Sequence, residues 1–231
     1  MQRDRARNFG PHELDPSKKN WHITDLAQAG RFYLENWHPD FTCPHERMYG
    51  RIRDGHKFVC DAHRLRDKKD CLVYSIGSND DFSFESALYA AAPNCEIHIF
   101  DFGDYGQSMK TNWKNLTATY HRNGLTGVGK EKNLLLSFPN ILKKLGHENR
   151  RIDILKVDCE SCEWDAYPDI LAAPNHISQL LVETHRVRSE FFHAVHDAGY
   201  ALFHKEPNTV WQGGCEWSFL KLDKSFWKDD E

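Results

Sequence analysis

The stretch LVYSIGSNDD, at residues 72–81, decides the fold. Its first five residues are apolar or small, as in a short strand that is buried on both faces. The glycine that follows them allows a sharp turn and a close approach of the backbone to a ligand. Further strand candidates of similar length follow along the chain, at residues 96–100, 117–121, 152–157 and 177–182.

Helix candidates alternate with these strands, at residues 82–92, 105–113, 139–145, 164–172 and 189–198. This alternation predicts a parallel sheet with helices on both faces. Two last strand candidates, at 200–203 and 217–220, have no helix between them and predict an antiparallel hairpin at one edge. The sequence therefore predicts an α/β fold with a Rossmann-like, seven-stranded, mostly parallel sheet.

The part of the chain before the sheet has a different character. Residues 1–20 are charged and contain Gly and Pro, which predicts a mobile arm. Residues 21–70 predict an N-terminal helix, capped by Thr24 and running to about Trp37, and then an irregular cap rich in Arg, His and Gly. We therefore expect an arm, an N-terminal helix and cap, and a main domain over residues 71–231.

The composition excludes some classes of partner. The 231 residues contain 30 Lys and Arg against 34 Asp and Glu, for a formal charge of −4. This balance argues against a nucleic-acid partner that is bound through its phosphates. No apolar run approaches the roughly 20 residues of a membrane helix, so no membrane segment is expected in this chain. The oligomeric state stays open.

The seven cysteines leave at least one thiol unpaired within the chain. Cys71 and Cys95 begin two strands that should be parallel neighbours, so a disulfide between them is possible, and Cys43 could pair with Cys60. Together with a glycosylation sequon at residues 115–117, these pairs suit a secretory-pathway lumen, with the signal or anchor outside this chain. A cytoplasmic protein with free thiols fits almost as well, so the compartment stays open.

The loop after the first strand bears on the cofactor, because ligands of open parallel sheets bind beyond the carboxyl ends of the strands. A dinucleotide site would need further glycines after Gly77, but Asp80 and Asp81 stand there and would repel a diphosphate. S-adenosylmethionine has a sulfonium, an ammonium and no phosphate, so it fits this loop better than NAD. Asp101, 24 residues after Gly77, lies at an offset where an acid can accept both ribose hydroxyls. The alternatives are acids that only complement a helix dipole and a solvated loop aspartate.

Carboxylates gather after the fourth and fifth strands. Asp158 and Glu160 would share one side if the strand continues, and Glu183 ends the next strand, followed closely by His185. Such side chains can bond a cofactor amino group, act as a general base or hold a divalent cation such as Mg²⁺. The alternatives are an acid-rich helix N-terminus for the first pair and a structural role for His185.

Three stretches resemble a known family. Residues 73–85 (VYSIGSNDDFSFE) resemble the first motif of a branch of class I S-adenosylmethionine methyltransferases. Residues 156–164 (KVDCESCEW) are similar to the D-x-E-G-x-E-W stretch of FkbM-type O-methyltransferases and related methyltransferase-like proteins, and residues 54–61 resemble the segment before the sheet in the latter. The resemblance covers roughly residues 43–222 and implies that 71–231 is the methyltransferase domain.

The resemblance also implies a cofactor-binding set. For the methionine part of S-adenosylmethionine, it implies Gly77, Ser78 and Asn79, with Glu85 from the same motif. For the ribose it implies Asp101, for the adenosine Phe102, and for the adenine Gly124 and Leu125. Asp158 and Glu160 would lie beside the transferred methyl group. The chain departs from the family pattern at three positions. Ser75 stands where many relatives have an acid, Ser161 replaces the usual glycine, and Phe102 replaces a frequent proline.

These observations predict an S-adenosylmethionine-dependent methyltransferase that acts on a hydroxyl of a small molecule or glycan. Its catalytic pool is Asp158, Glu160, Glu183 and His185, and a divalent metal is possible at Asp158, Glu160 and Glu183. Two alternatives stay open. The first is a non-catalytic binding module that keeps the fold, and the second is a nucleotide-dependent oxidoreductase, which the missing glycines disfavour.

Overall fold

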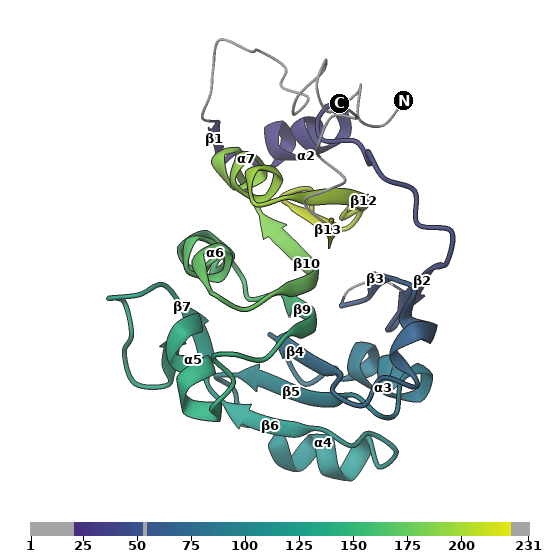
Figure 1. The fold of residues 1–231 in the computed structure, drawn as a ribbon. Coiled ribbons are helices and arrows are strands. Elements are labelled where there is room, and N and C mark those ends of the chain that lie inside the picture. The colour runs from purple at the N-terminus through teal and green to yellow at the C-terminus, as the bar shows by residue number, and fades with distance from the viewer. Residues whose placement is uncertain (1–20, 53–54, 223–231) are drawn as a thin grey trace.

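The computed structural model describes residues 21–52 and 55–222 (Figure 1), so the arm predicted over residues 1–20 lies outside the described residues. A seven-stranded sheet forms its centre, in the order β12-β13-β10-β9-β4-β5-β6. The strands are β4 (Leu72–Ile76), β5 (Glu96–Asp101), β6 (Thr119–Arg122), β9 (Ile152–Val157), β10 (Ile177–His185), β12 (Tyr200–Pro207) and β13 (Gly214–Lys221). The strands from β10 to β6 are parallel, and β13 is antiparallel to both of its neighbours. The predicted α/β class and edge hairpin are confirmed.

Helices cover both faces of this sheet (Figure 1). One face carries α3 (Ser83–Ala91) and α4 (Gly106–Asn112), and the other carries α5 (Phe138–Leu145), α6 (Glu163–Ala172) and α7 (Glu190–Asp197). Side chains alternate between the two cores, so that in β4 Tyr74 and Ile76 join the core under α5–α7, while Val73 joins the other. Because both faces are covered, every residue of β4 and β9 is buried.

The first helix, α2 (Leu26–Glu35), packs on the α7 side of the sheet. Its Phe32 ring lies 6.4 Å from that of Phe192 in α7. The helix is capped by Asp25, whose carboxylate accepts a hydrogen bond from the Gln28 N–H at 2.9 Å, so the prediction of Thr24 as the cap is wrong by one residue. Asp25 stands three residues before Gln28, which is the spacing that a capping carboxylate needs.

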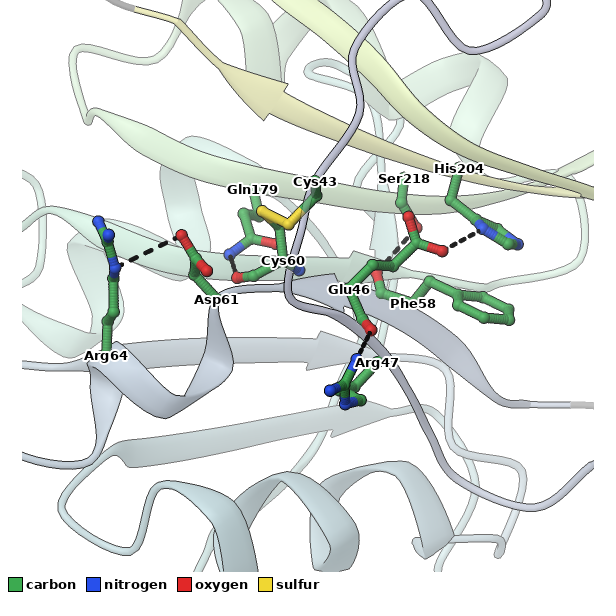
Figure 2. The surroundings of a disulfide bond; sticks show 10 residues. All are labelled: Cys43, Glu46, Arg47, Phe58, Cys60, Asp61, Arg64, Gln179, His204 and Ser218. Carbon is green, nitrogen blue, oxygen red and sulfur yellow. Dashed lines mark hydrogen bonds and ion pairs between the residues drawn. A yellow bond between two sulfur atoms is a disulfide. The ribbon is translucent and has the colours of Figure 1, made fainter.

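A β-hairpin occupies part of the region that was predicted to be irregular. β2 (Glu46–Tyr49) pairs antiparallel with β3 (Lys57–Cys60), and a 3₁₀ turn follows (Ala62–Leu65). Figure 2 shows how the hairpin is attached to the sheet. The Gln179 side chain of β10 bonds both the N–H and the carbonyl of Cys60, and the Ser218 hydroxyl of β13 donates to the Phe58 carbonyl. These bonds hold β3 against β10 and β13.

Two further strand pairs are too short to show any periodicity in the sequence. β1 (His22–Ile23) pairs antiparallel with β11 (Val187–Arg188), and β7 (Gly124–Thr126) pairs parallel with β8 (Leu135–Ser137). Across residues 21–52 and 55–222, each helix is too short or too polar to traverse a lipid bilayer.

Three disulfide bonds hold six of the seven cysteines. The Cys43–Cys60 and Cys71–Cys95 bonds are both present, as the sequence suggested, with Cα atoms 5.9 and 4.5 Å apart. A third bond, Cys159–Cys162, was not expected from the sequence. Cys215 is a buried free thiol.

Candidate active site

A cleft of about 290 Å³ opens where β4, β5 and β9 end. The order of the sheet reverses between β4 and β9, so the cleft lies at the switch point where α/β sheets bind ligands. Its volume is close to the lower end of the range for small-molecule sites, about 300–1,000 Å³.

Gly77 follows the last residue of β4 and packs against the backbone of Asp158, which follows the last residue of β9. Its φ is +80°, and an added Cβ would lie 1.6 Å from the carbonyl oxygen of Asp158. Its N–H donates to the carbonyl of Phe100 at 2.8 Å. No side chain fits at this position, so the close approach of the two strands requires glycine.

Asp101 organises the backbone of the neighbouring loop. Its Oδ2 accepts hydrogen bonds from the N–H groups of Ser78 and Asn79, both at 2.9 Å, and its Oδ1 accepts one from Gly103 at 2.8 Å. Ser78 lines the cleft, and its hydroxyl oxygen is buried without a hydrogen-bond partner among the described residues. A buried polar atom usually has a partner, so Ser78 fits a site that receives a polar ligand.

The turn after β9 contains two residues in the left-handed region. Glu160 has a φ of +53° and Ser161 a φ of +83°. The usual glycine would adopt this conformation without penalty, and the serine adopts it at a cost of about 1 kcal/mol. The Cys159–Cys162 disulfide closes the turn around both residues, and Cys159 lines the cleft. The departure from the family pattern at Ser161 therefore leaves the left-handed turn in place.

A buried cluster of charged side chains lies beside the cleft. The Lys57 ammonium, from β3, is fully buried and contacts Asp158 Oδ2 at 2.8 Å and Glu216 Oε1 at 2.7 Å. Glu183, near the end of β10, hydrogen-bonds the Asp158 carboxyl group. Lys156 Nζ donates to the Gly77 carbonyl at 2.5 Å and lies 3.9 Å from Asp158 Oδ2.

The carboxyl groups of this cluster have different charge states. Burial opposes ionisation of Asp158, but Lys57 and Lys156 outweigh it and lower its pKa well below the usual range. Burial, followed by repulsion from Asp158 and Glu216, raises the pKa of Glu183 to about 9. Burial likewise raises the pKa of Glu216 to about 7. At neutral pH, Asp158 is therefore ionised, Glu183 holds a proton, and two lysines compensate the negative charge at this edge of the cleft.

His185 belongs to a second, adjoining network. Its Nδ1 lies 3.2 Å from Glu163 Oε1, and its Nε2 lies 3.2 Å from Glu160 Oε2. Burial lowers the pKa of His185, but Glu163, Glu183 and Glu160 together raise it to about 9. His185 is therefore protonated at neutral pH and is no proton acceptor there.

The structure brings eight of the predicted site residues to the lining of the cleft: Gly77, Ser78, Asn79, Asp101, Phe102, Gly124, Asp158 and Glu160. The lining does not include Glu85, Leu125, Glu183 or His185. Glu85 is a buried residue of α3 and accepts a hydrogen bond from the Ser75 hydroxyl, so a carboxylate does reach the strand position where many relatives have an acid. Leu125 packs in the core.

Three charged residues of the site were missed from the sequence: Lys57, Lys156 and Glu216. Each lies within a strand, where spacing and composition give no sign that a charged side chain is buried in or beside a cleft. The sequence signal that exists is weak, since a lysine within an otherwise apolar strand must either face solvent or meet a buried acid.

The metal-binding set proposed from the sequence is not assembled as expected. Donor atoms of Asp158, Glu183 and His185 lie within 4.8 Å of one another, and Glu160 is not part of this group. The Lys57 ammonium already occupies one face of Asp158, and Glu183 and His185 hold protons that a metal would have to displace. The donor set therefore fits a divalent cation poorly.

The comparisons with known proteins agree with this geometry. The model of a methyltransferase-domain family matches residues 2–221. The chain belongs to this methyltransferase family. The family is one of S-adenosylmethionine-dependent enzymes, which fits a cleft with an acid at the ribose offset and an unpartnered serine hydroxyl.

Two curated relatives share part of the domain. The chain is 32% identical over 133 residues to "Probable methyltransferase-like protein 24" of Rattus norvegicus and 30% identical over 132 residues to the protein of that name from Homo sapiens. Each match covers 54% of this chain and 35% of the relative, so the match spans about a third of the length of these relatives. A Methanococcus jannaschii fibrillarin pre-rRNA processing protein has 8% identity and a TM-score of 0.46, covering 80% of this chain and 86% of that one.

Proposed function

We propose that this domain is an S-adenosylmethionine-dependent methyltransferase that transfers the methyl group to a hydroxyl of a small molecule or glycan. The observation that carries the proposal is Asp158, an ionised carboxylate in the lining of a cleft at the switch point of the sheet. A hydroxyl group needs such a proton acceptor to become nucleophilic.

The half of the cleft on the β4–β5 side would bind the cofactor. Ser78 and Asn79 would face the methionine part, Asp101 the ribose, and Phe102 and Gly124 the adenine ring. Phe102 is 69% exposed, so a ring stacked on it would remove apolar surface from water. S-adenosylmethionine supplies an electrophilic methyl group when it is bound.

In the half of the cleft on the β9–β10 side, Asp158 would orient the acceptor. Its carboxylate would accept a hydrogen bond from the acceptor hydroxyl. It would take the hydroxyl proton as the oxygen bonds to the methyl carbon and the bond from that carbon to the cofactor sulfur breaks, which would leave S-adenosylhomocysteine. Lys57 and Glu183 would be positioning residues, because both contact Asp158 and neither lines the cleft. In this arrangement most of the rate enhancement comes from alignment of the two reactants.

Calorimetry with S-adenosylhomocysteine, and separately with NAD, tests the assignment of the cofactor. We expect S-adenosylhomocysteine to bind and Asp101→Ala to weaken it by tenfold or more, because the loop loses its organising acceptor. Asp104→Ala is the matched control, since Asp104 is an exposed aspartate three residues away that pairs with Arg122. Binding of NAD alone, or equal affinities in both variants, would refute the proposal.

A non-catalytic binding module is the second candidate function. It is favoured by the lysine pair at Asp158, which makes this carboxylate a weak base. The two candidates differ in one measurement. A catalyst forms S-adenosylhomocysteine in the presence of a panel of glycans and small hydroxyl compounds, and loses this turnover in Asp158→Asn, whereas a binding module forms none.

A further inference from the structure

A group of histidines that the proposed function does not use lies on the α5 side of the sheet. His98 is on β5, His121 is on β6, and His147 follows Gly146, the residue that caps the end of α5. Glu96, the first residue of β5, lies beside them. The His98 and His147 side chains are only 8% and 9% exposed, whereas Glu96 is 45% exposed and gives the group access to solvent.

The donor atoms of three of these side chains converge. One atom each from Glu96, His98 and His147 lies within 4.8 Å of the others. Glu96 Oε1 is 2.7 Å from His98 Nε2 and 3.8 Å from His147 Nε2. Ligand atoms of a tetrahedral zinc ion, bound at about 2.0–2.1 Å, are separated by about 3.4 Å, and the two observed distances lie on either side of this value.

The remaining nitrogen of each imidazole already has a hydrogen-bond partner. His98 Nδ1 lies 2.8 Å from His121 Nε2, and His147 Nδ1 lies 2.7 Å from the Tyr74 hydroxyl. Histidines that bind metals usually donate their second N–H to a hydrogen-bond acceptor, which fixes the tautomer and directs the lone pair of the other nitrogen toward the metal. His121 Nε2 and the Tyr74 hydroxyl oxygen can both accept such a bond.

We propose that Glu96, His98 and His147 form a binding site for one Zn²⁺ ion or a similar divalent transition metal, with the fourth position open to water. Two imidazoles and one carboxylate are a known three-ligand set for zinc. None of these residues lines the cleft, so the site is separate from the proposed function and is tested without any methyl-transfer assay.

Arg150 is the group that the ion would displace. Its Nη1 lies 2.6 Å from Glu96 Oε2 and 3.1 Å from His147 Nε2. The Arg150 side chain is one-third exposed, so it can withdraw from His147 into solvent while Glu96 Oε1 binds the ion. Because Arg150 competes with the ion for His147, its replacement should strengthen metal binding.

The test uses the full chain, stripped with a chelator and titrated with ZnCl₂ by calorimetry, with the metal content measured after desalting. We expect one Zn²⁺ per chain and a rise in melting temperature by mass action. Glu96→Gln and His147→Gln should each weaken binding by tenfold or more, and Arg150→Met should strengthen it several-fold. Glu96→Gln changes a half-exposed side chain and keeps its shape, so we expect it to fold.

Two control variants locate the ion. His63→Gln changes an exposed histidine near His45, and His185→Gln removes a member of the other possible metal group at the active site. Both should retain the zinc affinity of the parent chain. The proposal is overturned if no zinc binds, if Glu96→Gln and His147→Gln bind as the parent chain does, or if either control loses the ion.

Discussion

The two halves of the cleft are built in different ways. On the β4–β5 side, backbone N–H groups of Ser78 and Asn79 meet one carboxylate, Asp101, at most 23 residues away in the sequence. On the β9–β10 side, side chains from distant elements meet, and Lys57 is 101 residues from Asp158 and 159 residues from Glu216. The first half therefore depends on local backbone geometry, and the second depends on the tertiary fold.

The two halves also differ in how far a single substitution can lower the free energy of unfolding. In the loop half, the loss of the Asp101 carboxylate leaves only neutral backbone N–H groups without their acceptor. In the charged half, the removal of one ion leaves its partners buried without compensation, which is among the most destabilising changes in a protein. The following variants test this contrast.

Lys57→Met should have the largest effect. It leaves the Asp158 and Glu216 carboxylates without their shared buried cation, and we expect it to lower the free energy of unfolding by about 3–5 kcal/mol. Urea unfolding at pH 7 measures the loss. Lys130→Met is the matched control, because the Lys130–Asp165 pair has the same 2.7 Å separation but is exposed, and such pairs contribute at most about 1 kcal/mol. Equal losses in the two variants would contradict a buried ionic cluster.

Gly77→Ala should have the next largest effect and tests the loop half. The added methyl group would lie 1.6 Å from the Asp158 carbonyl oxygen, so β4 and β9 must separate, at a cost of about 2–4 kcal/mol. We expect binding of S-adenosylhomocysteine to be lost as well. Gly129→Ala is the control, because Gly129 has the same φ of +80° with no atom within 4 Å of an added Cβ. It should cost only about 1 kcal/mol, and an equal cost at both positions would refute the steric argument.

A pH series separates the charged half from the loop half. The pKa values of Glu183 and His185 rise on folding from 4.5 and 6.5, respectively, to about 9. The proton on each group therefore stabilises the folded protein in full below the pKa that the group has in the unfolded chain. This stabilisation is lost as the pH rises toward 9. Between pH 7 and 9 we expect the free energy of unfolding to fall by up to about 1.4 kcal/mol per pH unit for each proton. Urea unfolding at pH 7, 8 and 9 measures this slope.

Glu183→Gln should remove one of the two protons that cause this slope, so the free energy of unfolding should fall less steeply between pH 7 and 9. Glu148→Gln, at an exposed glutamate near the end of α5, should leave the slope as it is in the parent chain. If Glu183→Gln has the same slope as the parent chain, then Glu183 is ionised in the folded state, and its role as a proton-holding partner of Asp158 is wrong.

The same contrast explains what could be predicted from the sequence. The alternation of strands and helices, the turn at Gly77 and the place of Asp101 follow from local patterns, and the fold and the loop half were predicted from them. Lys57 could not be found this way, because its burial depends on the attachment of β3 to β10 and β13 through Gln179 and Ser218 (Figure 2). Glu183 was noticed as an acid at a strand end, but its protonation depends on neighbours that only the fold brings together.

The smallest expected effect concerns Ser161 and shows how the two halves use the left-handed region. Gly77 is required by a contact, whereas Ser161, at a φ of +83°, has only the intrinsic penalty of a non-glycine residue. Ser161→Gly should therefore raise the free energy of unfolding by at most about 0.5 kcal/mol, since the added chain entropy of glycine, about 0.5–1 kcal/mol, offsets part of the removed penalty of about 1 kcal/mol. Ser161→Ala keeps the penalty and should give no gain. If the glycine variant is no more stable than the alanine variant, the Cys159–Cys162 bond already dictates this turn in the unfolded chain, and the serine has no cost there to relieve.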